Sequence, residues 1–519
     1  MFHYVAASVS AFFGLIYVFF ALGNCGVFGA IAKAILFTIA FNTGLLSSIS
    51  AYRVFFHRCC KFPGPLPAKV SRFYAAKKSA ENVQYYKEVA KLHATYGDFV
   101  RTGPREVSVL RRSAVQAIYG PNSECRKSTW YGQTGNDQQK TSIHMTRDHN
   151  KYRLRRRAWD RGFAIKAINT YEPRIKNKAD IFMDQLAKAG EKPVDVTKWG
   201  MFFSFDVMGE IGFSKDFNNL TTGVEHIAIK GVHDHMNMLG IMSMIPWLLN
   251  MLSCIPGAAS GYTDFFNFCS QEIHAKTKSW DPETYPQDLV SWLLKALKEK
   301  DVTAPSAEAL EDDTRVIIVA GSETTATTLA SALYFMAKYP EKQRKLQQLL
   351  DEVIPEPSAW DYEKVKATTY IDDWISETLR LRPALLNGGP RQTPARGITV
   401  DETYIPGGCN VLIPVSLIHR DPRWWQQAEE FIPERFGESR EEMGTDNAPY
   451  MPFSLGSYSC PGKNLGQLSL RISISSILGR FNVSFAPGET GETFINDTLD
   501  TFTVTLPPLN LQFTPRNQG

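Results

Sequence analysis

One cysteine near the carboxyl end lies in a segment whose residue types suit a reactive thiolate. Residues 452–466 read PFSLGSYSCPGKNLG, and an apolar run with helical spacing follows Cys460. The small and turn-forming residues predict a loop that delivers the cysteine to the start of a helix, with Pro461 in the first helical position. Because a helix N-terminus offers free N–H groups and a partial positive charge, we expect it to lower the pKa of Cys460.

The ligands available near this cysteine decide what its thiolate can do. Structural zinc needs four protein ligands, and Cys460 has no Cys or His neighbour in its segment. A lone thiolate suits an axial bond to haem iron, because the porphyrin supplies the four in-plane ligands. A buried structural cysteine is the default for an arbitrary Cys. The spacing F-x-x-G-x-x-x-C-x-G from Phe453 to Gly462 reverses that preference.

A second chemical signal lies inside a long predicted helix, which Ser306 caps and Pro340 ends. Residues 320–325 read AGSETT, so an acid, Glu323, adjoins the hydroxyl of Thr324. Such hydroxyls can bond backward to the helix backbone and open a local bulge. An acid beside a hydroxyl in such a bulge can hold water and pass protons. A threonine-rich packing face is the competing interpretation.

A pair of opposite charges precedes the cysteine segment. Glu377 and Arg380 are three residues apart on a helix predicted over residues 370–382, and Arg435 follows in the string PERF. Most pairs at this spacing are solvated and contribute little to stability. The segments follow one another in the order threonine helix, Glu–Arg helix, Arg segment and cysteine loop.

Together these segments resemble the haem-thiolate proteins of the cytochrome P-450 family. The resemblance covers nearly all of residues 50–515, and its most specific part is the cysteine loop. It implies that Cys460 is the axial ligand of the iron of haem b. It also implies that Phe453, Gly456 and Gly462 shape the loop that holds this cofactor.

The same resemblance implies roles for the other two signals. Glu323 and Thr324 match the acid and alcohol positions of the family's oxygen-activation motif, which delivers protons to reduced dioxygen. Glu377, Arg380 and Arg435 match a buried, bidentate triad that supports the haem-loop core. That triad serves folding and haem retention rather than proton transfer.

Haem propionate contacts are implied at further positions. The family usually has Arg or His two residues before the cysteine, and this chain has Tyr458, which can donate one hydrogen bond without the charge. Arg391 matches a position that commonly reaches the other propionate.

Residues 151–159 read KYRLRRRAW and are strongly basic. By resemblance they form a helix with a propionate contact and a docking surface for a reductase. Arg156, four residues after Tyr152, fits the family spacing, and His149 with Arg153 fits it equally, so both registers stay open. A solvated basic face is the simplest alternative.

The amino-terminal segment predicts a retained membrane anchor. The first 32 residues contain no charged side chain, and residues 5–31 and 34–52 are each long enough to cross a bilayer. A cleaved signal peptide would need a basic start and a shorter apolar run. Basic residues follow residue 52, which places the remaining chain in the cytosol. We therefore expect an anchor over residues 1–60, a proline-rich hinge over 61–67, and a haem-binding monooxygenase domain over 68–519.

Composition supports a large globular domain. The charge of 57 − 53 = +4 over 519 residues gives no concentrated basic face for nucleic acid, and 8 cysteines make no disulfide framework. Helical patterns dominate, with short strand-like stretches near residues 99–101, 107–110, 397–400 and 410–414. The predicted class is mainly α with a minor β region, the cytochrome P-450 fold after a transmembrane anchor.

The resemblance implies a haem-thiolate monooxygenase that inserts one oxygen atom of O2 into a small apolar substrate. No flavin or nicotinamide motif is visible, so electrons are expected from NADPH through a separate cytochrome P-450 reductase, with cytochrome b5 as a further partner. The implied location is the endoplasmic reticulum membrane, in contact with lipid, with the domain in the cytosol. There the N-x-S/T triplets stay unmodified, at Asn219, Asn482 and Asn496.

Alternatives remain at this point. The same scaffold could serve an isomerase or a peroxygenase, although the Glu323–Thr324 pair argues against both. A non-catalytic, membrane-tethered binding protein is favoured only by Tyr458. Pocket walls are expected from residues 121–145, 316–321 and 384–389. Filamentous-fungal relatives suggest secondary metabolism, and the substrate itself cannot be read.

Overall fold

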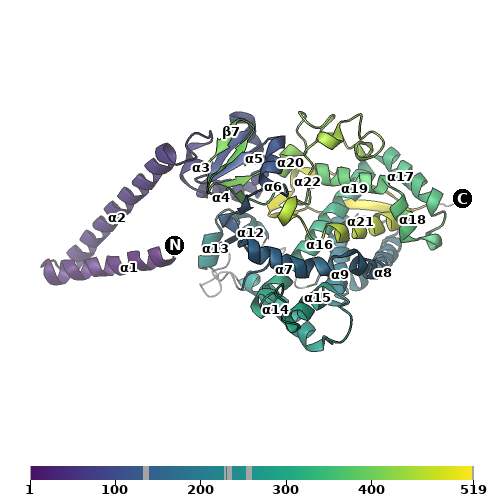
Figure 1. Cartoon of the computed structure of the whole chain (residues 1–519), viewed down its shortest axis with the longest axis horizontal. Coiled ribbons are helices and arrows are strands. Elements are labelled where there is room, and N and C mark those ends of the chain that lie inside the picture. The colour runs from purple at the N-terminus through teal and green to yellow at the C-terminus, as the bar shows by residue number, and fades with distance from the viewer. Residues whose placement is uncertain (1, 133–139, 227–228, 231–235, 253–259, 517–519) are drawn as a thin grey trace.

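The structure is a computed structural model and describes residues 2–132, 140–226, 229–230, 236–252 and 260–516. Two apolar helices, α1 (Phe2–Tyr17) and α2 (Val27–Ala51), extend away from the body of the protein in a V (Figure 1). With the π-helical turns that continue them, they form candidate spans of 20 and 30 residues that are 0% and 6% buried. The anchor is therefore built from two helices long enough to cross a membrane.

The body of the protein is mainly helical, as the sequence predicts. Its helices are α3 (Leu66–Val70), α4 (Phe73–Asn82), α5 (Tyr85–Tyr96), α6 (Arg112–Tyr119), α7 (His149–Gly162), α8 (Ile165–Ala189), α9 (Val196–Phe213), α10 (Asn219–Thr222), α12 (Met236–Met242), α13 (Pro246–Leu252), α14 (Ser260–Ser279), α15 (Leu289–Lys298), α16 (Ala307–Lys338), α17 (Pro340–Val353), α18 (Tyr362–Ala367), α19 (Tyr370–Leu381), α20 (Val415–Ile418), α21 (Lys463–Leu478) and α22 (Glu492–Asn496).

The strands are short; one group lies near the anchor, and a yellow C-terminal strand lies at the far end of the body, beside α21 (Figure 1). One sheet has the order β1 (Phe99–Gly103), β2 (Glu106–Val109), β8 (Asn410–Leu412), β5 (Arg391–Gln392), β3 (Arg126–Lys127). A second has the order β4 (Val194–Asp195), β12 (Asn510–Pro515), β9 (Phe481–Phe485). Two hairpins pair β6 (Ile398–Val400) with β7 (Thr403–Ile405), and β10 (Leu499–Thr501) with β11 (Thr503–Thr505).

Helix α16 runs through the core and packs against α9, α19 and α21. It is also apolar and long enough to resemble a membrane span, but 67% of that window is buried inside the protein. The Ser306 hydroxyl accepts a hydrogen bond from the Ala309 N–H at 3.1 Å, so Ser306 caps the helix as predicted. Helix α19 ends at Leu381, one residue before the predicted end, because the residue preceding Pro383 disfavours helical backbone.

The segment that joins the anchor to the body is packed rather than free. Cys59 and Phe62 are 0% and 3% exposed and belong to the apolar core beside the β1–β2 sheet. The Arg101 N–H of β1 donates to the Pro63 carbonyl at 2.7 Å, and α3 begins at Leu66, inside the predicted proline-rich spacer. Packing therefore adds to the stiffness that proline gives this segment.

Candidate active site

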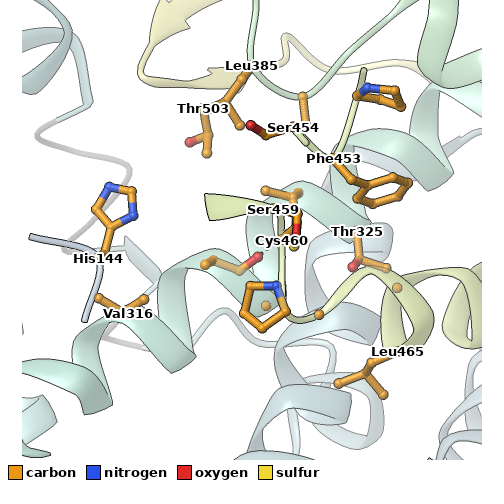
Figure 2. A pocket seen from close by; sticks show the side chains of 18 of the residues that line it. His144, Val316, Thr325, Leu385, Phe453, Ser454, Ser459, Cys460, Leu465 and Thr503 are labelled. Atoms are coloured by element: carbon orange, nitrogen blue, oxygen red, sulfur yellow. Dashed lines mark hydrogen bonds between the residues drawn. The ribbon is translucent and has the colours of Figure 1, made fainter. Parts of the chain in front are cut away.

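A cavity of about 330 Å³ lies in the middle of the body, between α16 and the cysteine loop. Its walls are mainly apolar, and Figure 2 shows Cys460 among them, with Thr503 and Leu385 on another side. Residues from each of the three predicted walls, 121–145, 316–321 and 384–389, line it, so the walls meet at one cavity; residues 133–139 lie outside the described residues. A mainly apolar cavity with a few polar groups is typical of a site for an organic ligand.

The cysteine loop is held by its own backbone. The Cys460 N–H donates to the Phe453 carbonyl at 2.9 Å, which closes the loop over residues 453–460. Gly456 has φ +61°, and a Cβ there would lie 2.6 Å from the Tyr119 carbonyl oxygen, so glycine is required for both reasons. A Cβ on Gly462 would meet only ordinary contacts, the nearest at 3.7 Å. The conformation of the loop therefore depends on Gly456 more than on Gly462.

The start of the helix after the loop differs from the prediction. Helix α21 begins at Lys463 with Gly462 as its N-cap, so Pro461 lies in the preceding turn and not in the first helical position. Burial raises the pKa of the Cys460 thiol, while the N–H groups of Gly462 and Lys463 act in the opposite direction. The expected lowering is wrong for the free thiol, because the apolar cavity outweighs the helix terminus.

Charge around the cavity tests whether a haem fits. Lys127, Arg156 and Arg391 all line it, and neither Lys127 nor Arg391 forms an ion pair within the described residues. The Lys127 ammonium is buried and donates to the carbonyls of Ile143 and His144 at 2.8 and 2.7 Å. Buried cations without carboxylate partners suit an anionic ligand. The thiol that opens to the same cavity and these cations together fit a haem with its two propionates.

The structure distinguishes the two registers of the basic helix α7. Tyr152 and Arg156 line the cavity, and the Arg156 guanidinium donates to the Tyr152 hydroxyl at 3.1 Å and to the Ser459 carbonyl at 2.6 Å. His149 Nδ1 instead lies 3.1 Å from the Tyr458 hydroxyl. Arg156 is therefore the arginine of α7 that reaches the cavity and the cysteine loop.

Tyr458 stands among these cations. Its ring lies 4.9 Å from the Arg391 guanidinium and 5.4 Å from the Lys127 ammonium. A phenol ring attracts cations through its face, so Tyr458 helps to hold both of them at the cavity wall. In this chain the positive charge absent from position 458 is available from Lys127, a residue that sequence reasoning did not single out.

The acid and the alcohol of α16 lie differently with respect to the cavity. Thr324 lines it, and its hydroxyl donates backward to the Ala320 carbonyl at 2.8 Å. Helix α16 is a continuous α-helix here, so the expected bulge is absent from residues 307–338. Glu323 is buried and does not line the cavity; it accepts a hydrogen bond from the Thr503 hydroxyl at 2.6 Å. Burial raises the pKa of Glu323 to about 7.

Glu377, Arg380 and Arg435 lie together, each with a fully buried side chain. Arg380 holds the Glu377 carboxylate through two bonds of 2.7 and 2.8 Å, and Arg435 Nε donates to the same carboxylate at 3.0 Å. Both guanidinium groups also donate to backbone carbonyls between residues 419 and 430. The cluster fixes the long loop that precedes the cysteine segment.

His419 connects this cluster to the cysteine loop, and sequence reasoning missed it. Its carbonyl accepts from Arg380 at 2.8 Å, and its Nε2 accepts from the Met451 N–H at 3.0 Å, two residues before Phe453. Burial and the Arg380 charge lower the pKa of His419 to about 3, so the ring is neutral and can accept that bond. The string His-Arg-Asp-Pro at 419–422 predicts a turn, but nothing in the sequence indicates that His419 contacts Arg380 and Met451.

One end of the cavity is lined with aromatic rings. Phe502 stacks on Trp130 with centroids 5.2 Å apart and planes at 5°, and His144 meets the edge of Phe502 at 5.6 Å. His144 lines the cavity, and its Nε2 has no hydrogen-bond partner within the described residues. These residues come from distant parts of the chain, so spacing alone could not predict the group.

A haem-thiolate protein is the class that this fold and site define: a lone thiol and the Thr324 hydroxyl meet at a cavity with a cationic wall, and the acid Glu323 is buried beside it. Comparisons give the family. The model of the cytochrome P-450 family matches residues 63–515. A cytochrome P-450 monooxygenase of Eupenicillium brefeldianum is 36% identical, with 92% of this chain and 95% of the relative covered. Another, of Fusarium pseudograminearum, is 36% identical over 92% of this chain and 86% of the relative.

Two further comparisons agree. The tryprostatin B 6-hydroxylase of Aspergillus fumigatus is 31% identical over 86% of this chain and 79% of the relative. The crystal structure of a cytochrome P-450 shares the fold with a TM-score of 0.71 at 19% identity, over 84% of this chain and 96% of that one. The chain belongs to the cytochrome P-450 family and is a haem-thiolate monooxygenase that uses haem iron, O2 and electrons from a redox partner.

Proposed function

We propose that the chain hydroxylates a C–H bond of a small apolar molecule, with Cys460 as the axial ligand of haem b. The observation that carries this proposal is the Cys460 thiol, which opens to the same cavity as Thr324 and the aromatic rings. A thiolate-ligated haem supplies the chemistry of dioxygen activation when it is bound. Phe453, Gly456 and Gly462 would shape the loop that holds this cofactor, and Tyr458, Arg156 and Arg391, together with Lys127, would hold its propionates.

The protein's own residues orient the substrate and move protons. Leu385, Val316 and Phe502 offer an apolar surface that excludes water, and His144 Nε2 offers a polar contact to a substrate oxygen or nitrogen. Glu323 stores a proton in a dry environment, and Thr324 presents a hydroxyl to the cavity. The Glu377–Arg380–Arg435 cluster keeps the cysteine loop in place and takes no part in proton transfer.

Electrons are proposed to come from an NADPH-dependent cytochrome P-450 reductase, with cytochrome b5 as a second donor. The exposed residues of α7 include Lys151, Arg153 and Arg157, on the helix that carries Arg156 to the cavity. A basic face so close to the cofactor site would attract an acidic partner and shorten the path of the electron.

We also propose that the domain faces the cytosol from the endoplasmic reticulum membrane. Helices α1 and α2 expose apolar side chains that lipid would cover, and Arg53, Arg58 and Lys61 follow directly after them. Asn219 is 1% exposed and donates to the Asp206 carboxylate at 2.6 Å, so glycosylation of that triplet is sterically excluded. We place the reaction in fungal secondary metabolism, since one relative is named a tryprostatin B hydroxylase.

The test is a reduced carbon-monoxide difference spectrum of the full chain in microsomes, followed by turnover. The thiolate-type band is expected for the native chain and is lost in Cys460→Ser, whereas Cys125→Ser, at a buried cysteine that does not line the cavity, retains it. Incubation with reductase, NADPH and a panel of candidate metabolites should then give a product 16 mass units heavier. Turnover with peroxide alone would instead indicate a peroxygenase, and no haem band would indicate a binding protein.

A further inference from the structure

A buried acid lies one hydrogen bond away from the cavity. Glu323 is 5% exposed and is absent from the cavity wall, whereas Thr503 is part of that wall. The Thr503 hydroxyl donates to Glu323 Oε2 at 2.6 Å. This is the only hydrogen bond that the Glu323 carboxylate forms within the described residues. The connection between acid and cavity therefore runs through a residue 180 positions further along the chain.

The hairpin holds the Thr503 hydroxyl in this position. Thr501 pairs with Thr503 across the β10–β11 turn, and the Thr501 hydroxyl donates to the Thr503 carbonyl at 2.6 Å. Phe502, at the tip, has φ +86°, a left-handed conformation that costs energy for an aromatic residue. Its stacking on Trp130 offsets that cost. A strained turn fixed from both sides presents the neighbouring hydroxyl to Glu323.

The hydroxyl of Thr324 is engaged elsewhere. It donates to the Ala320 carbonyl within the same helix, at 2.8 Å. A proton that leaves Glu323 therefore meets Thr503 first. Figure 2 shows Thr503 on the cavity side that also carries Leu385, apart from Leu465.

We propose that Thr503 is a proton-relay residue between Glu323 and the cavity, an inference that rests on the proposed monooxygenase function. In one step the Glu323 carboxylic acid gives its proton to Thr503 Oγ1, and Thr503 gives its own hydroxyl proton to a water in the cavity. The O–H bond of the acid breaks, one O–H bond forms and one breaks at Thr503 Oγ1, and one forms on the water. No electron moves, and Glu323 is left as a carboxylate that accepts the hydrogen bond of the Thr503 hydroxyl. Water returns the proton to Glu323 between turnovers.

The test uses the full-length holoenzyme with reductase and NADPH, without any organic substrate. Thr503→Val keeps the shape and removes the hydroxyl, so hydrogen peroxide released per NADPH oxidised is expected to rise at least twofold. Thr503→Ser restores the native ratio. Thr505→Val, in the same hairpin and off the cavity wall, is the matched control and keeps the native ratio, because the Thr505 hydroxyl contacts Thr501 and not Glu323.

A second readout does not depend on turnover. The infrared band of the protonated Glu323 carboxyl is assigned by its loss in Glu323→Gln. In Thr503→Val this band should titrate at higher pH, because the Thr503 hydrogen bond stabilises the ionised carboxylate in the native chain and is absent from the variant. Burial and this bond are the two influences on the Glu323 pKa. A native peroxide ratio in Thr503→Val, or an equal rise in Thr505→Val, would overturn the relay. Absence of a thiolate-type band in the native chain would instead reject the proposed function.

An independent observation concerns two thiols that do not line the cavity. The sulfurs of Cys59 and Cys409 are 3.0 Å apart, and both residues are 0% exposed. Cys59 lies between the anchor and α3, and Cys409 directly precedes β8. The Cys59 N–H donates to His57 Nδ1 at 3.1 Å and the Cys409 N–H to the Thr393 hydroxyl at 3.0 Å, so both backbones are fixed with the thiols facing each other.

The geometry points to a disulfide that forms when hydrogen peroxide oxidises this pair. Two S–H bonds and the O–O bond of the peroxide break, one S–S bond forms, and two waters leave. The bond would tie the segment after the anchor to the main sheet. A monooxygenase releases hydrogen peroxide when it reduces dioxygen without oxidising its substrate. The oxidant is therefore produced by the enzyme itself.

Microsomes carrying the full chain are treated with hydrogen peroxide, denatured, alkylated and analysed by peptide mass spectrometry. A cross-linked pair of peptides containing Cys59 and Cys409 is expected, and Cys409→Ser abolishes it. The exposed neighbour Cys60 is the control, since its oxidation shows that peroxide reached the segment. Oxidised Cys60 beside two freely alkylated thiols at 59 and 409 would overturn the proposal.

Discussion

At the scale of single residues, the raised pKa of Glu323 makes the stability of the protein depend on pH. Its pKa of about 7 in the folded protein compares with 4.5 ordinarily. Between these values the native state keeps a proton that the unfolded chain releases, so the free energy of unfolding falls as pH rises. Glu323→Gln cannot ionise, so its stability relative to the native chain should increase by about 3 kcal/mol from pH 4 to pH 8.

Urea unfolding at the two pH values, followed by circular dichroism, measures this difference. Glu308→Gln, at an exposed acid of the same helix, serves as the control. A pH-independent difference for Glu323→Gln would mean that the acid is already solvated in the folded protein.

The number of charges left unpaired predicts how much each substitution in the buried Glu–Arg cluster lowers the stability. Glu377 neutralises one of two fully buried guanidinium groups, so Glu377→Gln leaves both arginines without a carboxylate. Arg435→Met leaves the Glu377–Arg380 pair intact. We expect Glu377→Gln to lose at least 3–5 kcal/mol, by analogy with buried pairs that lose one partner, and Arg435→Met to lose less.

Haem content per folded protein and the midpoint of thermal unfolding give the ranking. The exposed pair Lys78–Glu81 provides a matched control, because Glu81→Gln removes a solvated partner worth less than about 1 kcal/mol. Equal losses at Glu377 and Arg435 would show that shape rather than charge is what the cluster contributes.

At the scale of elements, the packing of α9 on α16 depends on Gly321. A Cβ there would lie 2.1 Å from Met208 Sδ, whereas a Cβ on Gly200, in the same interface, meets its nearest atom at 3.6 Å. Overpacking costs about 1–3 kcal/mol, and replacing a helical glycine by alanine gains about 1 kcal/mol. Gly321→Ala should therefore lower the stability by up to about 2 kcal/mol, and Gly200→Ala should raise it slightly.

Thermal unfolding of both variants tests this packing. Because the clash is with a flexible side chain, adding Met208→Ala to Gly321→Ala should recover part of the loss. Two variants whose effects simply add would indicate that Met208 moves aside at no cost.

Local signals in the sequence predicted the elements well and their contacts poorly. The cap at Ser306, the end of α19 before Pro383 and the loop around Cys460 follow from residues near in sequence. The position of Pro461 was wrong, because the turn extends to Gly462 before α21 begins. The structure adds three residues that act through tertiary contacts between distant parts of the chain: Thr503, Lys127 and His419. Hydrophobic periodicity and turn-forming residues are local features, so they cannot predict such contacts.

At the scale of the whole molecule, the boundary between anchor and body is defined by burial. Phe62 is 3% exposed and Cys59 is 0% exposed, although both precede the predicted end of the hinge. A chain that begins at residue 57 should leave the membrane and still bind haem, because it keeps both residues. A chain that begins at residue 66 loses the Phe62 side chain from the β-side core, at a cost of about 3–5 kcal/mol.

Sedimentation after membrane extraction, haem content and thermal midpoint compare the two truncations. Full-length Phe62→Ala separates the core contribution from the loss of the anchor, and it should reproduce most of the difference in thermal midpoint between them. If both truncations unfold at the same temperature as the full chain, the segment between α2 and α3 is a passive tether. The structure argues against that outcome, since the Pro63 carbonyl accepts a hydrogen bond from β1 and the Cys59 thiol contacts Cys409, directly before β8.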